Sequence, residues 1–407
     1  MEVKRYIHPI GQGGFYTETL SNGNQTKNFV YDCGGFNRNQ TKMKDYLKSY
    51  LDKLDQETGK KEIEAVFISH FHSDHINGLQ YLLENARVKY LVLPQLTEDV
   101  LIEAFVYNYC QTGTYNRVNR FLWYLNEVSK FENGEGPRPS IIQIAEADDS
   151  LLPEDFNSEI FDNEVFGLEA WNWRQNTRMD LTSLSIAPSS TVLHCGKWLY
   201  IPFNSTVEPG KREKLRRRLE KEFGENITIN NLAELLKKKV GVQKCKNIYN
   251  DVFDNKHNGY SMTLFSGTTV KDSYRFKKGF EDYYCRYCHD YFCWCHHRCT
   301  RDCPYCWNPN FLYYGDFEPE HNIDKLMRFY NPVWNKIASI QVPHHGSKHN
   351  YDRKLYEYPF RGIVSVGNSN PYHHPDIDTM AKIQRLGCIP VFVTENQSTK
   401  RVYEYWG

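Results

Sequence analysis

A short string of metal-binding residue types follows an apolar run at residues 64–69, which has the composition of a buried strand. The string holds three histidines and one aspartate: His70, His72, Asp74 and His75. In an extended chain His70 and His72 point to the same side, and a tight turn after them can return the other two ligands to the same point. Imidazole nitrogen and carboxylate oxygen are the ligands of catalytic zinc, which keeps one position open for water. The string therefore predicts a divalent-metal site rather than a polar loop that is rich in histidine by chance.

The charge of the chain is balanced, with 50 Lys and Arg against 50 Asp and Glu over 407 residues. A zero net charge excludes a general attraction to nucleic acid or to a membrane surface, so any such binding needs a local patch. Aromatic residues make up 15% of the chain, which is typical of a globular fold. No apolar stretch approaches the roughly 18 residues of a membrane span. Residues 1–9 lack the apolar core of a signal peptide, so we expect a cytoplasmic protein without membrane contact.

Seven of the 12 cysteines cluster between residues 285 and 306. Two Cys-x-x-Cys pairs flank the cluster, and the full set of expected zinc ligands is Cys285, Cys288, Cys293, Cys295, Cys299, Cys303, Cys306 and His289. Paired Cys-x-x-Cys knuckles are typical of a zinc ribbon, and these ligands suffice for one or two structural zinc ions. Because such a segment has little apolar core, metal must hold it together. Clustered cysteines without a signal peptide also favour a reducing cytoplasm.

The predicted zinc segment spans residues 270–310 and mixes arginine with aromatic residues. Arg286, Arg298 and Arg301 are interleaved with tyrosine, phenylalanine and tryptophan. Such a surface can stack on bases and contact phosphates, or it can dock a protein partner. The sequence leaves both functions open.

Strand and helix patterns alternate along the rest of the chain, which predicts a layered α/β architecture. Residues 1–40 alternate like hairpins, residues 41–57 have the period of an amphipathic helix, and residues 97–131 are mostly helical. A further helix is expected over residues 77–84. Strands are expected at residues 64–69, 88–94, 140–144, 181–187, 191–194, 198–203, 261–265, 311–314, 340–343, 362–366, 391–394 and 401–403.

Residues 205–257 are predicted to form a basic helical insertion. Two stretches rich in lysine and arginine have a helical period there, Lys211–Phe223 and Leu232–Val240. We interpret their cations as a solvated face, with contact to nucleic acid as the alternative.

The ordered motifs of the chain resemble the metallo-β-lactamase superfamily. These motifs are the histidine string, Gly315-Asp316 after a strand, and Pro343-His344-His345-Gly346-Ser347. Within the superfamily the chain is most similar to the hydrolase domain of the competence protein ComEC and its stand-alone soluble relatives. That likeness rests on Asn258-Gly259-Tyr260-Ser261 and Asn370-Pro371-Tyr372-His373-His374-Pro375. The resemblance implies a four-layer αββα sandwich over residues 1–407, with the two insertions added and with metal at one edge.

The resemblance also implies the ligands of a two-metal site. They are His70 and His72 for the first ion, Asp74 and His75 for the second, and Asp316 as the bridge between them. One histidine of the pair His344 and His345 completes the second site, and His345, which directly precedes the glycine, is favoured. Asp32, at the end of an early strand, orients the histidine string from outside the ligand set.

Position 258 departs from the pattern of many superfamily members. Many of them place a third histidine of the first metal site there, whereas this chain has Asn258 with His257 beside it. The ComEC-like branch commonly has asparagine at this place, so Asn258 is the expected ligand and His257 the alternative. A weaker first site follows, which fits a metal that tolerates oxygen ligands, such as manganese, as well as zinc.

A two-metal site lowers the pKa of a bound water to about 7 and can clamp the attacking and leaving oxygens of a phosphoryl displacement. Together with the resemblance, this predicts a metal-dependent hydrolase, a phosphodiesterase or nuclease acting on DNA, RNA or a nucleotide. We expect Asp74 to orient the hydroxide, His374 to act as general acid or phosphate-oxygen donor, and Ser347 to donate to phosphate. His374 can equally be a turn histidine. Two alternatives stay open: a hydrolase of a lactam, lactone or thioester, and a binding protein whose metal is structural.

Overall fold

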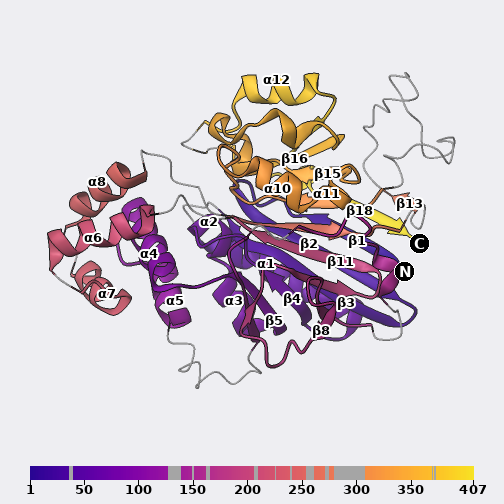
Figure 1. The fold of residues 1–407 in the computed structure, drawn as a ribbon, viewed down its shortest axis with the longest axis horizontal. Helices are drawn as coiled ribbons and strands as arrows, with labels where there is room; N and C mark the ends of the chain where they lie inside the picture. The colour runs from indigo at the N-terminus through magenta and orange to yellow at the C-terminus, as the bar shows by residue number, and fades with distance from the viewer. Residues whose placement is uncertain are drawn as a thin grey trace.

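Two large β-sheets pack face to face, and helices cover their outer faces (Figure 1). A computed structural model describes residues 1–35, 40–126, 139–148, 151–161, 166–205, 210–224, 226–238, 241–253, 261–270, 275–278, 308–368, 370 and 373–407. The order of layers is helix, sheet, sheet, helix. The four-layer αββα sandwich predicted from the sequence is therefore confirmed.

The first sheet is mixed, with an antiparallel part and a parallel part. In spatial order its strands are β13 (Arg275–Lys278), β18 (Arg401–Trp406), β1 (Glu2–Ile7), β2 (Gly13–Asn22), β3 (Gln25–Gly35), β4 (Glu62–Phe67), β5 (Arg87–Pro94), β6 (Ser140–Ile144) and β9 (Ile186–Ala187). β3 and β4 run parallel, so their carboxyl ends meet at the same edge of the sheet. Asp32 and the histidine string lie at those two ends.

The second sheet is built the same way and ends in parallel strands. In spatial order its strands are β17 (Ile389–Val393), β16 (Arg361–Ser365), β15 (Ser339–Gln341), β14 (Phe311–Tyr313), β12 (Met262–Gly267), β11 (Trp198–Asn204), β10 (Thr191–Cys195), β7 (Glu169–Asn172) and β8 (Thr177–Met179). The chain after β14 carries Asp316, and the chain after β15 carries His344 and His345. Two neighbouring parallel strands therefore deliver the second half of the predicted metal site to one edge.

Three apolar clusters correspond to the three interfaces between the layers. The cluster between the sheets includes Tyr16, Phe67, Tyr200 and Leu264. The outer face of the first sheet packs on α1 (Gln40–Thr58) and α3 (Leu79–Asn85). The outer face of the second sheet packs on α10 (Ile323–Phe329), α11 (Asn331–Trp334) and α12 (Ile377–Arg385). Strands buried on both faces are typical of such layered folds.

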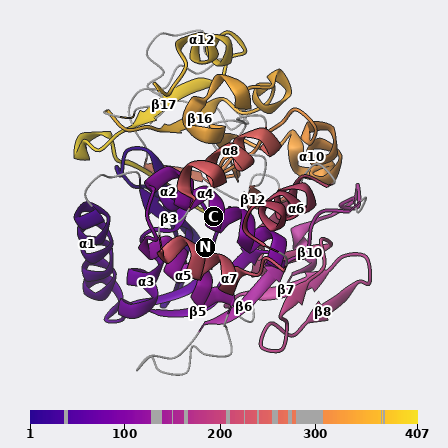
Figure 2. The same ribbon diagram turned by 90° about the vertical axis from the view of Figure 1, so that its left-hand side faces the viewer.

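Five further helices gather at one end of the molecule, which faces the viewer in Figure 2. We call them the helical unit: α4 (Glu98–Thr112), α5 (Arg117–Asn126), α6 (Lys211–Phe223), α7 (Ile229–Lys237) and α8 (Val242–Phe253). α4 lies in the middle, because it contacts the other four helices. Their apolar side chains belong to the same cluster as α1 and the outer face of the first sheet. No helix among the described residues is both long and apolar enough to cross a membrane.

Two predicted elements differ clearly from the observed ones. The helix expected at residues 77–84 begins only at Leu79 as α3, because the Gly78 amide donates to the Cys33 carbonyl of β3 at 2.8 Å, and a separate short helix, α2 (Ser73–Ile76), precedes it. The strand expected at residues 181–187 shortens to β9, because Asp180 caps a turn by accepting from the Thr182 amide. The helices α8, α10, α11 and α12 were not predicted.

The cations of α6 are largely paired with acidic residues. Arg212 lies 2.9 Å from Glu103 and 2.8 Å from Glu146. Arg216 contacts both Glu98 and Asp99 at the start of α4. These pairs use the basic charge to attach α6 to its neighbours, which favours the solvated, salt-bridged face over contact with nucleic acid.

A buried ion pair ties the two sheets together. The Arg5 Nε of β1 lies 2.6 Å from the Glu18 Oε1 of β2, and both side chains are at most 3% exposed. Glu18 also accepts hydrogen bonds from the Tyr313 hydroxyl at 2.7 Å and from the Ser266 hydroxyl at 2.7 Å, both on the second sheet. Although burial alone would raise it, Arg5 and the hydroxyl donors hold the pKa of Glu18 below its usual value. The pair is thus fully hydrogen-bonded across the sandwich.

We expect the change Arg5→Met to destabilise the protein by about 3–5 kcal/mol, because it leaves the Glu18 carboxylate buried without a counter-charge. The measurement is the free energy of unfolding in urea. The double variant Arg5→Met, Glu18→Gln removes both charges and should recover a large part of that loss. Equal stabilities for the single and double variants would contradict this account of the pair.

Candidate metal centre

The predicted histidine string lies at the edge of the first sheet, between β4 and α2. β4 ends at Phe67, and residues 68–72 form a loop that leads into α2. His70 and His72 are buried in this loop, and His75 on α2 is fully buried. Buried imidazoles need partners for their ring nitrogens, so the contacts of each nitrogen decide what the loop can do.

Asp32 holds this loop from β3. Its carboxylate accepts hydrogen bonds from the Ser69 amide at 2.7 Å, the Ser69 hydroxyl at 2.8 Å and His75 Nδ1 at 2.7 Å. Asp32 is fully buried and has a φ of 56°, in the left-handed region that a non-glycine residue rarely adopts. This backbone conformation directs the Asp32 carboxylate toward the histidine loop, which agrees with the orienting role expected for Asp32.

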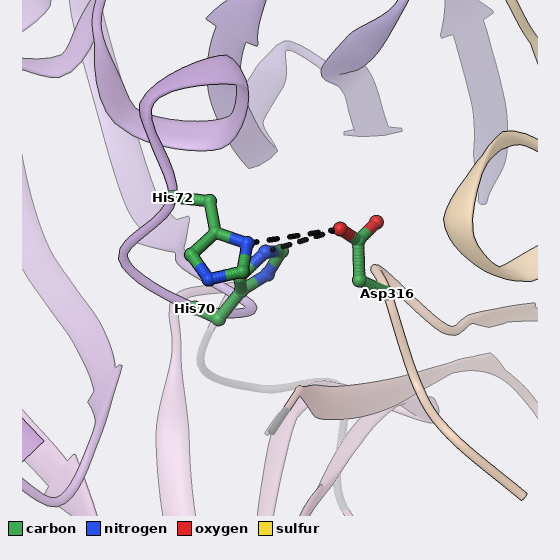
Figure 3. Close-up of side chains that lie close together, drawn as sticks. All are labelled: His70, His72 and Asp316. Carbon is green, nitrogen blue, oxygen red and sulfur yellow. Dashed lines mark ion pairs between the residues drawn. The ribbon is translucent and has the colours of Figure 1, made fainter. Parts of the chain in front are cut away.

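Asp316 lies opposite the loop, and its two carboxylate oxygens face different histidines. Oδ2 lies 3.4 Å from His70 Nε2 and 3.9 Å from His72 Nδ1, as drawn in Figure 3. Oδ1 lies 3.2 Å from His75 Nε2 and 4.0 Å from His345 Nε2. The carboxylate thus separates two groups that can each hold a cation: His70 and His72 with Asp316, and Asp74 and His75 with His345.

The partners of three ring nitrogens fix where the imidazole protons lie. His75 Nδ1 faces the Asp32 carboxylate, and His345 Nδ1 lies 2.8 Å from the Ser365 carbonyl oxygen. Both partners can only accept, so each Nδ1 carries a proton, and in the neutral ring each Nε2 presents a lone pair. His70 Nδ1 lies 2.9 Å from the Ser69 hydroxyl, which already donates to Asp32 and therefore accepts from the ring.

The atoms that face one another in the centre are all acceptors. Among the described residues, the buried atoms without a hydrogen-bond partner include Nε2 of His70, His75 and His345 and Oδ1 of Asp316. Unpaired buried polar atoms cost free energy and are rare in native structures. Nitrogen lone pairs and carboxylate oxygens in this arrangement are the ligand set of zinc or a related divalent ion, so the residues present fit a metal centre.

His344 and His345 both turn toward this centre. Their φ angles are 44° and 55°, so two consecutive residues adopt the left-handed conformation and direct both rings the same way. His345 Nε2 lies 3.4 Å from Asp74 Oδ2, whereas His344 Nε2 lies 4.0 Å from Asp316 Oδ2. The two histidines therefore face opposite oxygens of Asp316 and do not compete for one position.

The remaining predicted catalytic residues lie nearby, with different surroundings. The His374 ring is half-buried, with its centre 5.1 Å from that of His344. Burial, followed by the neighbouring His344 and His345, lowers the pKa of His374 to about 4, so the ring is neutral at pH 7. The Ser347 hydroxyl accepts from the His349 amide at 3.3 Å, and among the described residues it contacts no member of the metal centre.

Several predicted ligands lie outside the described residues. They are Asn258 with its neighbour His257, and the expected zinc ligands of the Cys-rich segment, Cys285, Cys288, His289, Cys293, Cys295, Cys299, Cys303 and Cys306.

Four contributors to the centre were not predicted. Asn350 accepts from His344 Nδ1 at 2.8 Å, the Ser365 carbonyl accepts from His345, Ser261 contacts His70, and Tyr107 stacks on His72. Ser261 belongs to the motif Asn258-Gly259-Tyr260-Ser261, so the sequence could have indicated it. Asn350 follows His344 by six residues, whereas Ser365 and Tyr107 lie further from their partners in the chain, and none of the three has a local signal.

Comparison with known proteins supports the fold at the histidine string. Residues 22–99 match the model of the metallo-beta-lactamase superfamily. The matched segment includes the histidine string and Asp32. Among solved structures, the short form of human tRNase Z is similar at 17% identity and a TM-score of 0.22, over 42% of this chain and 58% of that chain. The chain thus spans a little over half of that protein. No curated protein matches the chain.

The change Gly34→Ala tests whether β3 fixes the position of α2. A Cβ atom at Gly34 would lie 2.5 Å from the His75 carbonyl carbon and 2.6 Å from that of Asp74, so α2 must move. We expect the affinity for one divalent ion to fall by about 10–100-fold, the usual effect of misplacing metal ligands, in isothermal titration calorimetry. The control is Gly35→Ala, whose Cβ meets nothing closer than 3.7 Å. Equal affinities for both variants would refute this role of Gly34.

Proposed function

We propose that this protein is a metal-dependent hydrolase with two divalent ions, and that its substrate is a phosphodiester. The observation that carries the proposal is the convergence of buried, unpartnered acceptors from His70, His75, His345 and Asp316 on one place. Repulsion between these acceptors is relieved when cations lie between them.

The two groups around Asp316 support a place for each of two ions. His70 and His72 would hold the first ion with Asp316, and Asn258 remains the proposed additional ligand there. Asp74, His75 and His345 would hold the second ion beside the other oxygen of Asp316. Bound ions of this kind lower the pKa of a water to about 7 and polarise the bond to be cleaved.

The chain's own residues orient the reactants around this centre. Asp74 has a side chain that is 17% exposed, which is more than any other proposed ligand of the second ion. Its carboxylate can therefore accept from a water or hydroxide at the open side. His374 is neutral at pH 7, which suits a hydrogen bond to a substrate oxygen better than proton storage. Asn370 fixes the His374 backbone by donating to its carbonyl at 2.7 Å.

The choice of a phosphodiester rests on the ComEC-like motifs, which point to nucleic acid or a nucleotide as its source. A centre with two ions is compatible with this substrate, because two ions roughly 3.5–4 Å apart can stabilise both the attacking and the leaving oxygen of an in-line displacement. We also propose a cytoplasmic location, because clustered cysteines favour a reducing compartment. We further propose that the Cys-rich segment holds structural zinc and contacts nucleic acid or a protein partner.

The test is hydrolysis of bis(p-nitrophenyl) phosphate by the wild type and by Asp74→Ala, first with zinc and then with manganese. We expect metal-dependent turnover in the wild type and a loss of at least about 100-fold in the variant, because even residues outside the ligand set typically cost about 10–100-fold. A matched control is Asp180→Ala, since Asp180 only caps an exposed turn.

Two results would count against this function. Full turnover by Asp74→Ala would remove that residue from the reaction. Absence of turnover in a wild type that binds both ions would exclude a simple phosphodiester and leave hydrolysis of another ester or amide, or a binding role.

A further inference from the structure

The proposed ligands on the two oxygens of Asp316 have different support. We propose that the helical unit positions His72 and the backbone of its loop through Tyr107 and Asn108, and so sets the affinity of the ion on the Oδ2 side. The ion on the Oδ1 side is held by the sandwich alone. This inference rests on the proposed metal centre and adds positioning residues to it.

The histidines on the Oδ1 side are fixed by strands of the sandwich. His75 Nδ1 donates to Asp32 on β3 at 2.7 Å, and Asp32 is itself held by Ser69. His345 Nδ1 donates to the carbonyl of Ser365, the last residue of β16, at 2.8 Å. Both contacts are fully buried, and neither involves the helical unit.

The loop that carries His70 and His72 is held by α4. Phe71, between the two histidines, is 5% exposed and packs in the apolar cluster that contains the helical unit. The Asn108 amide donates to the Phe71 carbonyl at 2.9 Å. The Tyr107 ring stacks on the His72 ring with 3.7 Å between centres and 19° between planes. α4 therefore fixes both the backbone of this loop and the plane of one ligand.

The sandwich also contacts this loop, through Ser261 directly before β12. The Ser205 hydroxyl, directly after β11, donates to the Ser261 carbonyl at 3.1 Å. The Ser261 hydroxyl lies 3.1 Å from His70 Nδ1 and accepts from the Asp316 amide at 2.8 Å. One side chain of the sandwich thus contacts a proposed ligand and the backbone of the bridging aspartate.

The helical unit acts on the loop as one body, because its parts are joined to α4. Glu103 on α4 is 6% exposed and pairs with Arg212 on α6 at 2.9 Å. The Tyr249 ring of α8 lies 5.8 Å from that of Tyr107. A displacement of α6 or α8 would therefore reach His72 through α4.

Because α4 contacts the ligands on only one side of Asp316, removing its contacts should weaken the binding of only one of the two ions. Side chains that orient a metal ligand typically change metal affinity by about 10–100-fold. Tyr107→Leu removes the stacked ring and frees the His72 plane, whereas Tyr107→Phe keeps it. Ser261→Ala removes the hydroxyl at His70 without adding volume. None of these changes touches His75 or His345.

The experiment measures manganese binding by calorimetry and by electron paramagnetic resonance. Manganese prefers oxygen and nitrogen ligands to thiolates, so the Cys-rich segment does not obscure the result. We expect the wild type to bind two ions with an exchange-coupled spectrum. Tyr107→Leu should bind one ion about 10–100-fold more weakly and show the spectrum of an isolated ion, with the other affinity unchanged, whereas Ser261→Ala also frees the Asp316 backbone and should weaken both ions. Tyr107→Phe should behave like the wild type.

Tyr115→Leu is the matched control, since it makes the same substitution in the helical unit away from the loop, where Tyr115 lies near Lys237 and Phe105. It should keep both ions. Equal weakening of both ions in Tyr107→Leu, or no weakening of either, would overturn this inference while the metal centre stands. A wild type that binds no ion would overturn the metal centre and this inference together.

Discussion

The centre depends on one arrangement: the Asp316 carboxylate lies between two sets of histidine nitrogens that contribute lone pairs. In their neutral form His70, His75 and His345 present Nε2 lone pairs to this carboxylate, because hydrogen bonds to Ser69, Asp32 and Ser365 place a proton on Nδ1 at the far side of each ring. A buried cluster of acceptors without donors is unfavourable unless cations fill it. Metal binding would therefore stabilise the fold as well as supply chemistry, because the ions bind the folded state in preference to the unfolded one.

Much of the surrounding backbone is shaped to maintain that cluster. Asp32, His344 and His345 all adopt left-handed conformations, which cost about 1–3 kcal/mol each and persist only where the surroundings impose them. Parallel strands bring their carboxyl ends to one edge of each sheet. The buried Arg5–Glu18 pair links the two sheets across the interior. The sandwich thus supplies a rigid edge, and the helical unit closes one side of it.

The sequence predicted those parts of the site that are local. The string at residues 70–75 has the ligand types, the spacing and the preceding strand of a metal loop, and Asp32 and Asp316 were recognised from ordered motifs at strand ends. Most strands were also predicted, because their apolar residues recur with the period of two or in short continuous runs. α8 shows the limit of that approach, since Cys245, Tyr249 and Val252 recur at helical spacing and the helix was still not predicted.

Most parts that were not predicted depend on contacts between residues far apart in the chain. Nothing near Asn350 or Ser365 indicates that they fix the rings of His344 and His345. The helix expected at residues 77–84 begins two residues late, because Gly78 binds the backbone of β3, which is more than 40 residues earlier in the chain. The assignment of His344 and His345 to opposite oxygens of Asp316 follows from two consecutive left-handed residues, which composition and period do not reveal.

The most direct test of the metal centre is a crystal structure of the protein grown with manganese, with diffraction recorded on both sides of the manganese absorption edge. The account predicts two anomalous peaks roughly 3.5–4 Å apart, one between Asp316 Oδ2 and the histidines of the loop, and the other between Asp316 Oδ1, His75 and His345. No anomalous peak beside Asp316, with water molecules bonded to the histidine nitrogens instead, would contradict it.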